Sequence, residues 1–281
     1  MILVKMLETK LLIDQYINNI STKQIKIKFI NHFHILLKEC GLTFDLLQEE
    51  WISGSLKTYK SPCRSGSLFV LSKNKKFIMK TITKSEYETF KKIHQDYFDH
   101  MKQNTLLVKI FGLFKIKYWF SSLHIILMEN VNKFEQETNY IYDLKGRKPK
   151  RKINCTNEHI IKDNMLKNNF YLKEDYFDDL LEKLKKDIFF LESHHLIDYS
   201  LLIFLSKNNQ TNEIYIDDKL IEKFGMEIGI CDYLISYDRF VHKFTGFIKS
   251  FIWPKKTLSM VNHKYYAKRF LKYCYKIFSK I

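Results

Sequence analysis

The 281-residue sequence contains few of the residues that build small cross-linked or metal-stabilised domains. Its five cysteines lie far apart and form no C-x-x-C pair, which argues against a zinc module and against a disulfide framework. A reducing, intracellular setting is therefore expected. No window reaches about 18 uninterrupted apolar residues, because charges interrupt even the apolar N-terminus, so we expect any membrane association to be peripheral.

Glycine and proline are also scarce, at eight and three residues. Hydrophobic residues make up 46% of the chain, aromatic residues 15%, and the formal net charge is +16. This length and apolar content predict a folded globular protein of one large or two small domains. The positive charge predicts a polyanionic partner: a nucleic acid, an anionic membrane face or a phosphorylated substrate. Charge alone does not choose among them.

Hydrophobic periodicity predicts an α+β first half that contains an antiparallel sheet. Residues 1–50 have a mostly helical pattern, and residues 61–82 predict a hairpin with a small-residue loop at its entrance. A helix is expected from about Ser85, followed by two more strands within 105–131. From about residue 160 the pattern becomes helical.

The longest amphipathic pattern of the second half lies in "DYFDDLLEKLKKDIFFLES". One face of this helix is expected to carry its apolar side chains, at Phe177, Leu180, Leu181, Leu184, Ile188 and Leu191. The last segment, "KYYAKRFLKYCYKIFSKI", is also helix-like.

The first hairpin has features of a phosphate-binding loop. In "SGSLFVLSKNKKFIMK", the turn Ser65-Gly66-Ser67 opens one strand and Lys80 closes the next, so backbone N–H groups and an ammonium could converge on phosphates. Taken alone, the pattern is more often an ordinary turn and a solvated lysine.

Two carboxylates follow Lys80 on the next helix. Glu86 would lie on its first turn, where it could hold the lysine as in protein kinases, and Glu88 is the competing candidate. Either could instead be an exposed helix charge.

The stretch "IYDLKGRKPKRK" places Asp143 and Lys145 beside Gly146 and a dense basic run that ends at Lys152. The alternative is a solvated loop or a patch like those of nuclear-import signals. The functional interpretation is a site that holds several phosphates.

Two aspartates interrupt apolar β-like runs, Asp198 in "HLIDYSLLIF" and Asp232 in "MEIGICDYLISYD". Such a pair could flank a reacting phosphoryl group, one carboxylate facing the acceptor hydroxyl and the other holding magnesium. Singly, a buried aspartate is more often a hydrogen-bonded structural residue.

These segments occur together in an order that resembles the phosphatidylinositol phosphate kinases, which act on already phosphorylated inositol lipids. The resemblance covers roughly residues 25–281 and rests on the following segments: "SPCRSGSLFVLSKNKKFIMKT", "NTLLVKIFGLFKI", "LMENV", "YDLKG", "IDYSLL", "IGICDYL" and "KYYAKRFLKY".

The resemblance implies a role for each matching residue. Lys80, Lys145 and Asp198 are expected to be catalytic, and Asp232 is the expected Mg²⁺ ligand. The residues expected to bind ATP are Ser65, Gly66, Ser67, Lys80, Glu86, Glu129 and Val131. Contacts with the substrate or membrane are expected from Lys145, Arg147, Lys255 and Lys256.

The sequence departs from the family pattern at several places, of which two change the phosphate-binding segments. Pro62, Cys63 and Arg64 stand where many members have a glycine before the Ser-Gly-Ser turn, and Arg147 stands where a small hydroxyl residue is usual. The segment "FIKSFIWPKKTLSMV" combines Trp253 with lysines, as expected of a loop that enters lipid headgroups.

The fold implied is α+β and two-lobed, distantly similar to protein kinases, with an antiparallel sheet in the N-lobe and a mixed, helix-rich C-lobe. The expected division is a helical extension over 1–24, an N-lobe with the phosphate-binding loop over 25–130, and a C-lobe over 131–281.

The expected reaction is transfer of the ATP γ-phosphate to the 5-hydroxyl of phosphatidylinositol 3-phosphate, with Mg²⁺. Phosphatidylinositol 4-phosphate is the alternative substrate, and an inactive membrane-binding scaffold is the alternative of another class. The expected setting is the cytosolic face of endosomal, vacuolar or plasma membranes. A homodimer or scaffold partner stays open, and no nucleic acid is expected because no nucleic-acid-binding signature occurs. A protein kinase is disfavoured, since H-R-D-L-x-x-x-x-N and D-F-G are missing.

Overall fold

The computed structural model describes residues 24–52, 58–60, 67–118, 121–134, 138–148, 160–163, 165–166, 169–207, 213–216, 223–238, 258 and 260–281. The chain divides into two compact units. The unit that we call the N-unit contains residues 1–101 and 108–130, and the C-unit contains residues 102–107 and 131–281. The helical extension predicted for 1–24 lies outside the described residues, except for Gln24.

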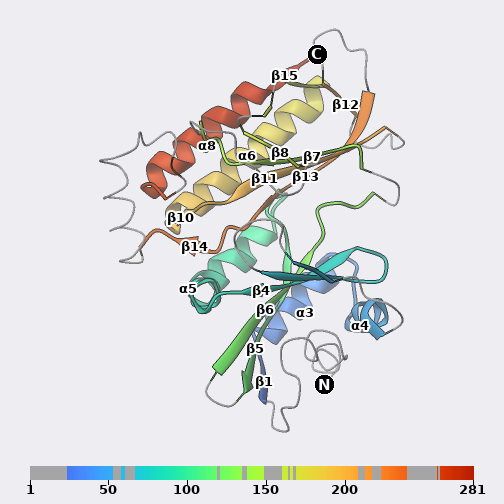
Figure 1. Cartoon of the computed structure of the whole chain (residues 1–281), viewed down its shortest axis with the longest axis vertical. Helices are drawn as coiled ribbons and strands as arrows, with labels where there is room; N and C mark the ends of the chain where they lie inside the picture. Colours follow the sequence, from blue (N-terminus) through green and yellow to red (C-terminus); the bar gives the residue numbers. More distant parts are fainter. Residues whose placement is uncertain are drawn as a thin grey trace. The chain divides into compact units, whose positions relative to one another are not determined.

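An antiparallel sheet organises the described part of the N-unit (Figure 1). Its strand order is β1-β5-β6-β4-β3-β2. The strands are β1 (Gln24–Lys28), β2 (Thr58–Lys60), β3 (Leu68–Leu71), β4 (Phe77–Ile82), β5 (Ile110–Tyr118) and β6 (Ser121–Glu129). The hairpin and the two later strands expected from the sequence are confirmed by β3, β4, β5 and β6.

Three described helices belong to the N-unit: α3 (Ile30–Glu39), α4 (Phe44–Ile52) and α5 (Lys84–Met101). Helix α5 begins where the sequence predicts a helix. Its start is fixed by a capping box, in which the Glu86 carboxylate accepts from the backbone N–H of Thr83 while the Thr83 hydroxyl accepts from the N–H of Glu86. The apolar face of α5 lies on the sheet, with Phe90 and Tyr97 fully buried.

Strand β1 corrects the mostly helical pattern expected for residues 1–50. In "QIKIK", isoleucines alternate with lysines, which is the two-residue period of a strand with one face toward a core. The strand pairs antiparallel with β5, Ile27 opposite Phe114. Among the described residues of this range, helical structure is confirmed in α3 and α4.

The described part of the C-unit contains a mixed sheet with the order β15-β9-β12-β13-β11-β7-β8. Its strands are β7 (Tyr140–Leu144), β8 (Ile160–Lys162), β9 (Phe170–Leu172), β11 (Ser200–Ser206), β12 (Glu213–Tyr215), β13 (Lys223–Cys231) and β15 (Phe278–Lys280). A separate two-stranded pair joins β10 (Leu196–Ile197) to β14 (Ile235–Ser236).

Two long helices, α6 (Glu174–Ser193) and α8 (His263–Ile277), lie side by side in the C-unit (Figure 1). Both helices were expected from the sequence. The strands between them were not all expected, because the pattern beyond residue 160 suggested mainly helix. The two units together confirm a mixed α+β fold with one antiparallel and one mixed sheet, consistent with a two-lobed kinase-like fold.

Candidate functional site

Three strands of the C-unit sheet end, and a fourth begins, at the same side of the sheet. Strands β7 and β13 both run antiparallel to β11, so their last residues, Leu144 and Cys231, lie near its first residues. Strand β8 runs parallel to β7 and therefore ends beside it. The residues that follow or precede these strand ends are Lys145, Asp163, Asp198 and Asp232. Pairing of the strands thus gathers one ammonium and three carboxylates at one edge of the sheet.

The structure brings together two of the residues that the sequence predicts to be catalytic. The Lys145 Nζ lies 2.8 Å from Asp198 Oδ1 and also donates to the Asp198 backbone carbonyl at 2.6 Å. Both side chains are about one-fifth exposed, at 19% and 20%. The lysine therefore contacts both the carboxylate and the backbone of Asp198 at a position that solvent and ligands can reach.

The turn that carries Lys145 is held by Asp163, which the sequence analysis missed. The Asp163 Oδ1 accepts from the backbone N–H of Lys145 at 2.8 Å and of Gly146 at 2.7 Å. Burial raises the pKa of the Asp163 carboxyl, and the hydrogen bonds from the turn partly oppose that shift. The available signal was its position: like Asp198 and Asp232, it directly follows the last residue of a strand.

Helix α8 holds the same turn from the other side. The Arg269 guanidinium donates to the Lys145 carbonyl at 3.5 Å and to the Leu258 carbonyl at 2.6 Å, and it lies over the Tyr266 ring. Burial lowers the pKa of Arg269. The Tyr266 hydroxyl donates at 2.5 Å to the carbonyl of Tyr199, the residue after Asp198. One helix therefore fixes both segments that meet in the Lys145 and Asp198 contact.

Gly146 is required by both backbone conformation and space. Its φ is +65°, in the left-handed region that favours glycine. A Cβ at this position would lie 3.1 Å from Tyr273 Cβ and 3.3 Å from the backbone of Phe270 in α8. A side chain at residue 146 would therefore force this turn or α8 to shift by a few tenths of an ångström.

The two aspartates do not lie inside strands, which corrects the expectation from the sequence. Asp198 separates β10 from β11, and Asp232 follows the last residue of β13. Both have positive φ, at 63° and 59°, a conformation that aspartate adopts more readily than most residues. Asp198 is half-buried and Asp232 is exposed, so neither carboxylate is sealed in the core.

The predicted nucleotide-binding lysine lies on the N-unit sheet. Lys80 is 6% exposed and its backbone is opposite Phe69 of β3 and Ile126 of β6. Its ammonium lies 5.5 Å from the centroid of the Phe69 ring.

The carboxylates proposed to hold Lys80 make other contacts. The Glu86 carboxylate accepts from the N–H and hydroxyl of Thr83, both at 2.7 Å, and the Glu88 carboxylate pairs with Lys91 at 2.8 Å. Glu86 is therefore a helix cap, and its pairing with Lys80 stays a prediction.

The remaining predicted residues fall into two groups. Ser67, Glu129 and Val131 are described: Ser67 precedes β3, the Glu129 carboxylate accepts from the N–H of Lys109 at 2.8 Å, and Val131 is buried. Ser65, Gly66, Lys255 and Lys256 lie outside the described residues. Arg147 is close to the site, with its Nε 3.8 Å from Asp163 Oδ2.

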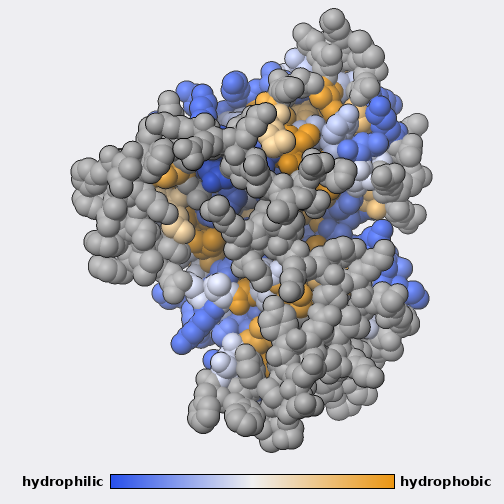
Figure 2. Space-filling view, viewed as in Figure 1, coloured by the Kyte–Doolittle hydropathy of each residue, from blue (hydrophilic) through white to orange (hydrophobic). Residues whose placement is uncertain are grey.

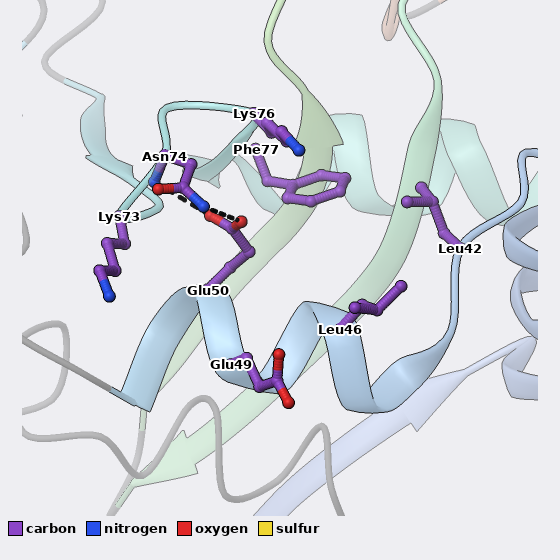
Figure 3. Close-up of a pocket in the computed structure, with 8 residues that line it drawn as sticks. All are labelled: Leu42, Leu46, Glu49, Glu50, Lys73, Asn74, Lys76 and Phe77. Carbon is purple, nitrogen blue, oxygen red and sulfur yellow. Dashed lines mark hydrogen bonds between the residues drawn. The ribbon is translucent and has the colours of Figure 1, made fainter.

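A pocket of about 500 Å³ lies elsewhere, in the N-unit between α4 and the turn from β3 to β4 (Figure 3). Its lining is Leu42, Leu46, Glu49, Glu50, Lys73, Asn74, Lys76 and Phe77. Glu50 and Asn74 point toward each other there, because the carboxylate accepts from both the backbone and the side-chain amide of Asn74. No residue predicted for the site lines this pocket, and its main polar pair is already satisfied.

One face of α8 is strongly basic. Lysines recur on it every four residues and are exposed, at Lys264, Lys268, Lys272 and Lys276. Within the described part of the chain, no ion pair involves these lysines, and α8 has no acidic residue. In Figure 2, hydrophilic side chains are visible at the upper left of the view, where Figure 1 places α8. Among the described helices, none has the length and apolar character needed to cross a bilayer.

Much of this chain aligns with known proteins. A family model described as phosphatidylinositol-4-phosphate 5-kinase matches residues 53–224. The chain is 28% identical to 1-phosphatidylinositol 3-phosphate 5-kinase FAB1 of Saccharomyces cerevisiae over 273 residues, which cover 89% of this chain and 10% of that protein.

Two relatives that are named for a different substrate align over a shorter part of this chain. Identity is 35% over 155 residues to phosphatidylinositol 4-phosphate 5-kinase 9 of Arabidopsis thaliana, covering 53% of this chain and 19% of that protein. Identity is 32% over 173 residues to phosphatidylinositol 4-phosphate 5-kinase type-1 sktl of Drosophila melanogaster, covering 58% and 22%. The chain thus spans between 10% and 22% of the length of these three relatives.

Replacing Gly146 by alanine is expected to destabilise the C-unit more than the same change at Gly41 destabilises the N-unit. Both glycines have positive φ, at 65° and 68°, so both variants incur the roughly 1–2 kcal/mol of a left-handed alanine. Only Gly146→Ala adds crowding, because nothing lies within 4 Å of a Cβ at Gly41. Urea denaturation should give an additional loss of about 1–3 kcal/mol for Gly146→Ala. Equal losses would contradict the close packing of this turn on α8.

Proposed function

The chain belongs to the phosphatidylinositol-4-phosphate 5-kinase family, and from this premise we propose that it transfers the γ-phosphoryl group of ATP to the 5-hydroxyl of a phosphoinositide. The observation that carries the proposal is the contact of Lys145 Nζ with Asp198 Oδ1 at 2.8 Å. It joins the two segments most typical of the family, "YDLKG" and "IDYSLL", at one edge of a rigid sheet.

Each side chain has a role that suits its chemistry. Asp198, whose side chain is about one-fifth exposed, orients the inositol hydroxyl and accepts its proton as the oxygen attacks phosphorus. Lys145 lies beside it and offsets negative charge on the transferred phosphoryl oxygens. Lys80 of the N-unit takes the part of the lysine that contacts ATP phosphates.

The Asp232 carboxylate is a suitable ligand for the Mg²⁺ ion of the reaction. Magnesium takes oxygen ligands and is commonly held by one or two carboxylates, with phosphates and waters completing the octahedron. Asp232 presents an exposed carboxylate at the end of β13, and the described residues contain no cluster of three or more His, Cys, Asp or Glu side chains for a metal. When bound, the ion supplies charge neutralisation on the ATP phosphates.

Phosphatidylinositol 3-phosphate is the substrate that we favour. The alignment with FAB1, a 3-phosphate 5-kinase by name, extends over 89% of the chain. Phosphatidylinositol 4-phosphate is the second candidate, because the 4-phosphate 5-kinases of Arabidopsis and Drosophila have higher identity, 35% and 32%, over 53% and 58% of the chain. An inactive scaffold is the candidate of another class, and magnesium-dependent use of ATP would exclude it.

Peripheral attachment to an anionic membrane follows from the substrate, and the basic face of α8 offers one surface for it. Each lysine near an anionic bilayer contributes about 1 kcal/mol. Lys255 and Lys256 remain further candidates. The expected setting is the cytosolic face of endosomal, vacuolar or plasma membranes, with a homodimer or scaffold partner left open.

The reaction can be tested with labelled ATP, Mg²⁺ and separate vesicles that contain phosphatidylinositol 3-, 4- or 5-phosphate. We expect a product labelled at the 5-position from the 3-phosphate lipid. A 5-labelled product from the 4-phosphate lipid alone would favour the second candidate. Failure to label any lipid, with no magnesium-dependent ATP use, would contradict the proposed activity and favour the scaffold.

Asp198→Asn should lower lipid phosphorylation by a factor of about 100 to 10,000, because it removes the proton acceptor while keeping the size of the side chain. Its thermal midpoint should stay close to that of the unmodified protein. Asp178→Asn is the matched control, since that carboxylate is 59% exposed and pairs with Lys280 away from the site. Near-normal phosphorylation by Asp198→Asn would rule out its assigned role.

Replacing Lys268 and Lys272 together by alanine should weaken binding to vesicles that contain phosphatidylserine. Loss of about 1 kcal/mol for each lysine corresponds to about 30-fold weaker binding. The control replaces Lys173 and Lys186 by alanine. This change removes the same charge, but these lysines form ion pairs with Glu213 and Glu182. Co-sedimentation at several salt concentrations measures the difference, and equal losses in both variants would exclude α8 as the attachment surface.

A further inference from the structure

Helix α6 carries a carboxylate on its buried face. Asp187 is fully buried, although the neighbouring positions on this face, Leu184, Ile188 and Leu191, are apolar and buried as expected from the sequence. A carboxylate is costly to bury unless hydrogen bonds compensate for lost water. Its partners therefore show what Asp187 holds in place.

Those partners belong to the short C-unit segment 102–107, which precedes β5. The Thr105 hydroxyl donates to Asp187 Oδ1 at 2.5 Å, and the Leu106 backbone N–H donates to Asp187 Oδ2 at 2.7 Å. The Thr105 hydroxyl oxygen also accepts from the N–H of Leu107 at 3.0 Å. Asp187 thus fixes the backbone of three consecutive residues, which we call the clamped segment, Thr105 to Leu107.

The clamped segment pairs with β13 on the side opposite β11. Among the described residues, strand β12 pairs with β13 over Lys223 to Gly225. Further along, the Ile230 N–H donates to the Leu106 carbonyl at 2.7 Å, and Leu107 forms a parallel bridge with Ile230. Ile230 and Leu107 are both buried. The end of β13 is therefore held on one side by β11 and on the other by the clamped segment.

Asp232 follows two residues after Ile230. It has a φ of 59°, and residues in such sparsely populated conformations persist when the surrounding structure over-determines them. The exposed Asp232 carboxylate gains this support from the strand end just before it, where the contacts with Leu106 and Leu107 lie.

We propose that Asp187 is a positioning residue for Asp232: through the clamped segment it fixes the end of β13 and so the carboxylate that holds Mg²⁺. The inference rests on the proposed function, which assigns the metal to Asp232. In this proposal Asp187 acts through its hydrogen bonds with Thr105 and Leu106 and through the bond from Ile230 to Leu106.

The test measures binding of a fluorescent ATP analogue to the full chain in EDTA and at increasing Mg²⁺ concentrations. Asp187→Ala should raise the Mg²⁺ concentration for half-maximal binding about tenfold, the lower end of the range for residues that support metal ligands. Binding in EDTA should be unchanged. Asp187→Asn keeps one oxygen acceptor for Leu106 and should show a smaller shift.

A second variant changes the residue that contacts Asp187 in the clamped segment. Thr105→Val removes the hydroxyl that joins Asp187 to Leu107 but leaves the carboxylate in place. It should shift the Mg²⁺ dependence in the same direction. Hydrogen exchange provides a readout independent of metal, because the Ile230 amide should exchange faster in both variants than in the unmodified chain.

A control separates positioning from general loss of stability. Leu180→Ala removes a buried side chain from the same helix, about two turns before Asp187. It should lower the thermal midpoint but leave the Mg²⁺ dependence unchanged. The positioning role is overturned if Asp187→Ala shifts the Mg²⁺ dependence no more than Leu180→Ala does, and if Thr105→Val does not shift it.

Asp232→Asn distinguishes this inference from the function on which it rests. If Asp232→Asn abolishes Mg²⁺-dependent nucleotide binding and Asp187→Ala does not alter it, only the positioning role fails. If Asp232→Asn has no effect on the Mg²⁺ dependence, the metal assignment fails, and the role of Asp187 fails with it.

Discussion

The pairing of β7, β11 and β13 is the constraint on which the candidate site depends. Because β11 runs antiparallel to both neighbours, its beginning lies between their ends, and three chemically useful side chains emerge together at Lys145, Asp198 and Asp232. Residues that are tens of positions apart in the sequence therefore lie next to one another at one side of the sheet. The hydrogen bonds of the sheet therefore set the geometry, and the turns beyond the strands refine it through Asp163 and Arg269.

Local signals predicted much of the fold because the physical cause was local. The capping box at Thr83 and Glu86 marks the start of α5, and the period of Leu180, Leu184 and Ile188 marks the buried face of α6. Lys145 and Asp198 were identified through their motifs, which are short. By contrast, Asp163 and Asp187 have no such motif: each is defined by backbone N–H groups far away in the sequence, which only the folded chain brings within reach.

The same reasoning explains where the sequence misled. An aspartate inside an apolar run suggested a buried carboxylate, yet the backbone turns at both Asp198 and Asp232 and carries the side chain out of the strand. The family match ends at residue 224, before Asp232 and before α8. Helix α8 nevertheless belongs to the same structural unit as much of the matched region. Its Tyr266 donates to Tyr199, and its Arg269 donates to Lys145.

Positive φ angles at Asp198 and Asp232 restrict which residues these positions accept. Most side chains cost roughly 1–2 kcal/mol in this conformation, and only glycine, asparagine and aspartate adopt it readily. Glutamate carries the same charge but lacks the short side chain that stabilises such turns locally. The backbone therefore selects among amino acids before the chemistry does, and of the two acidic residues it favours aspartate. A change from aspartate to glutamate at either position is for this reason a change of main-chain conformation as well as of reach.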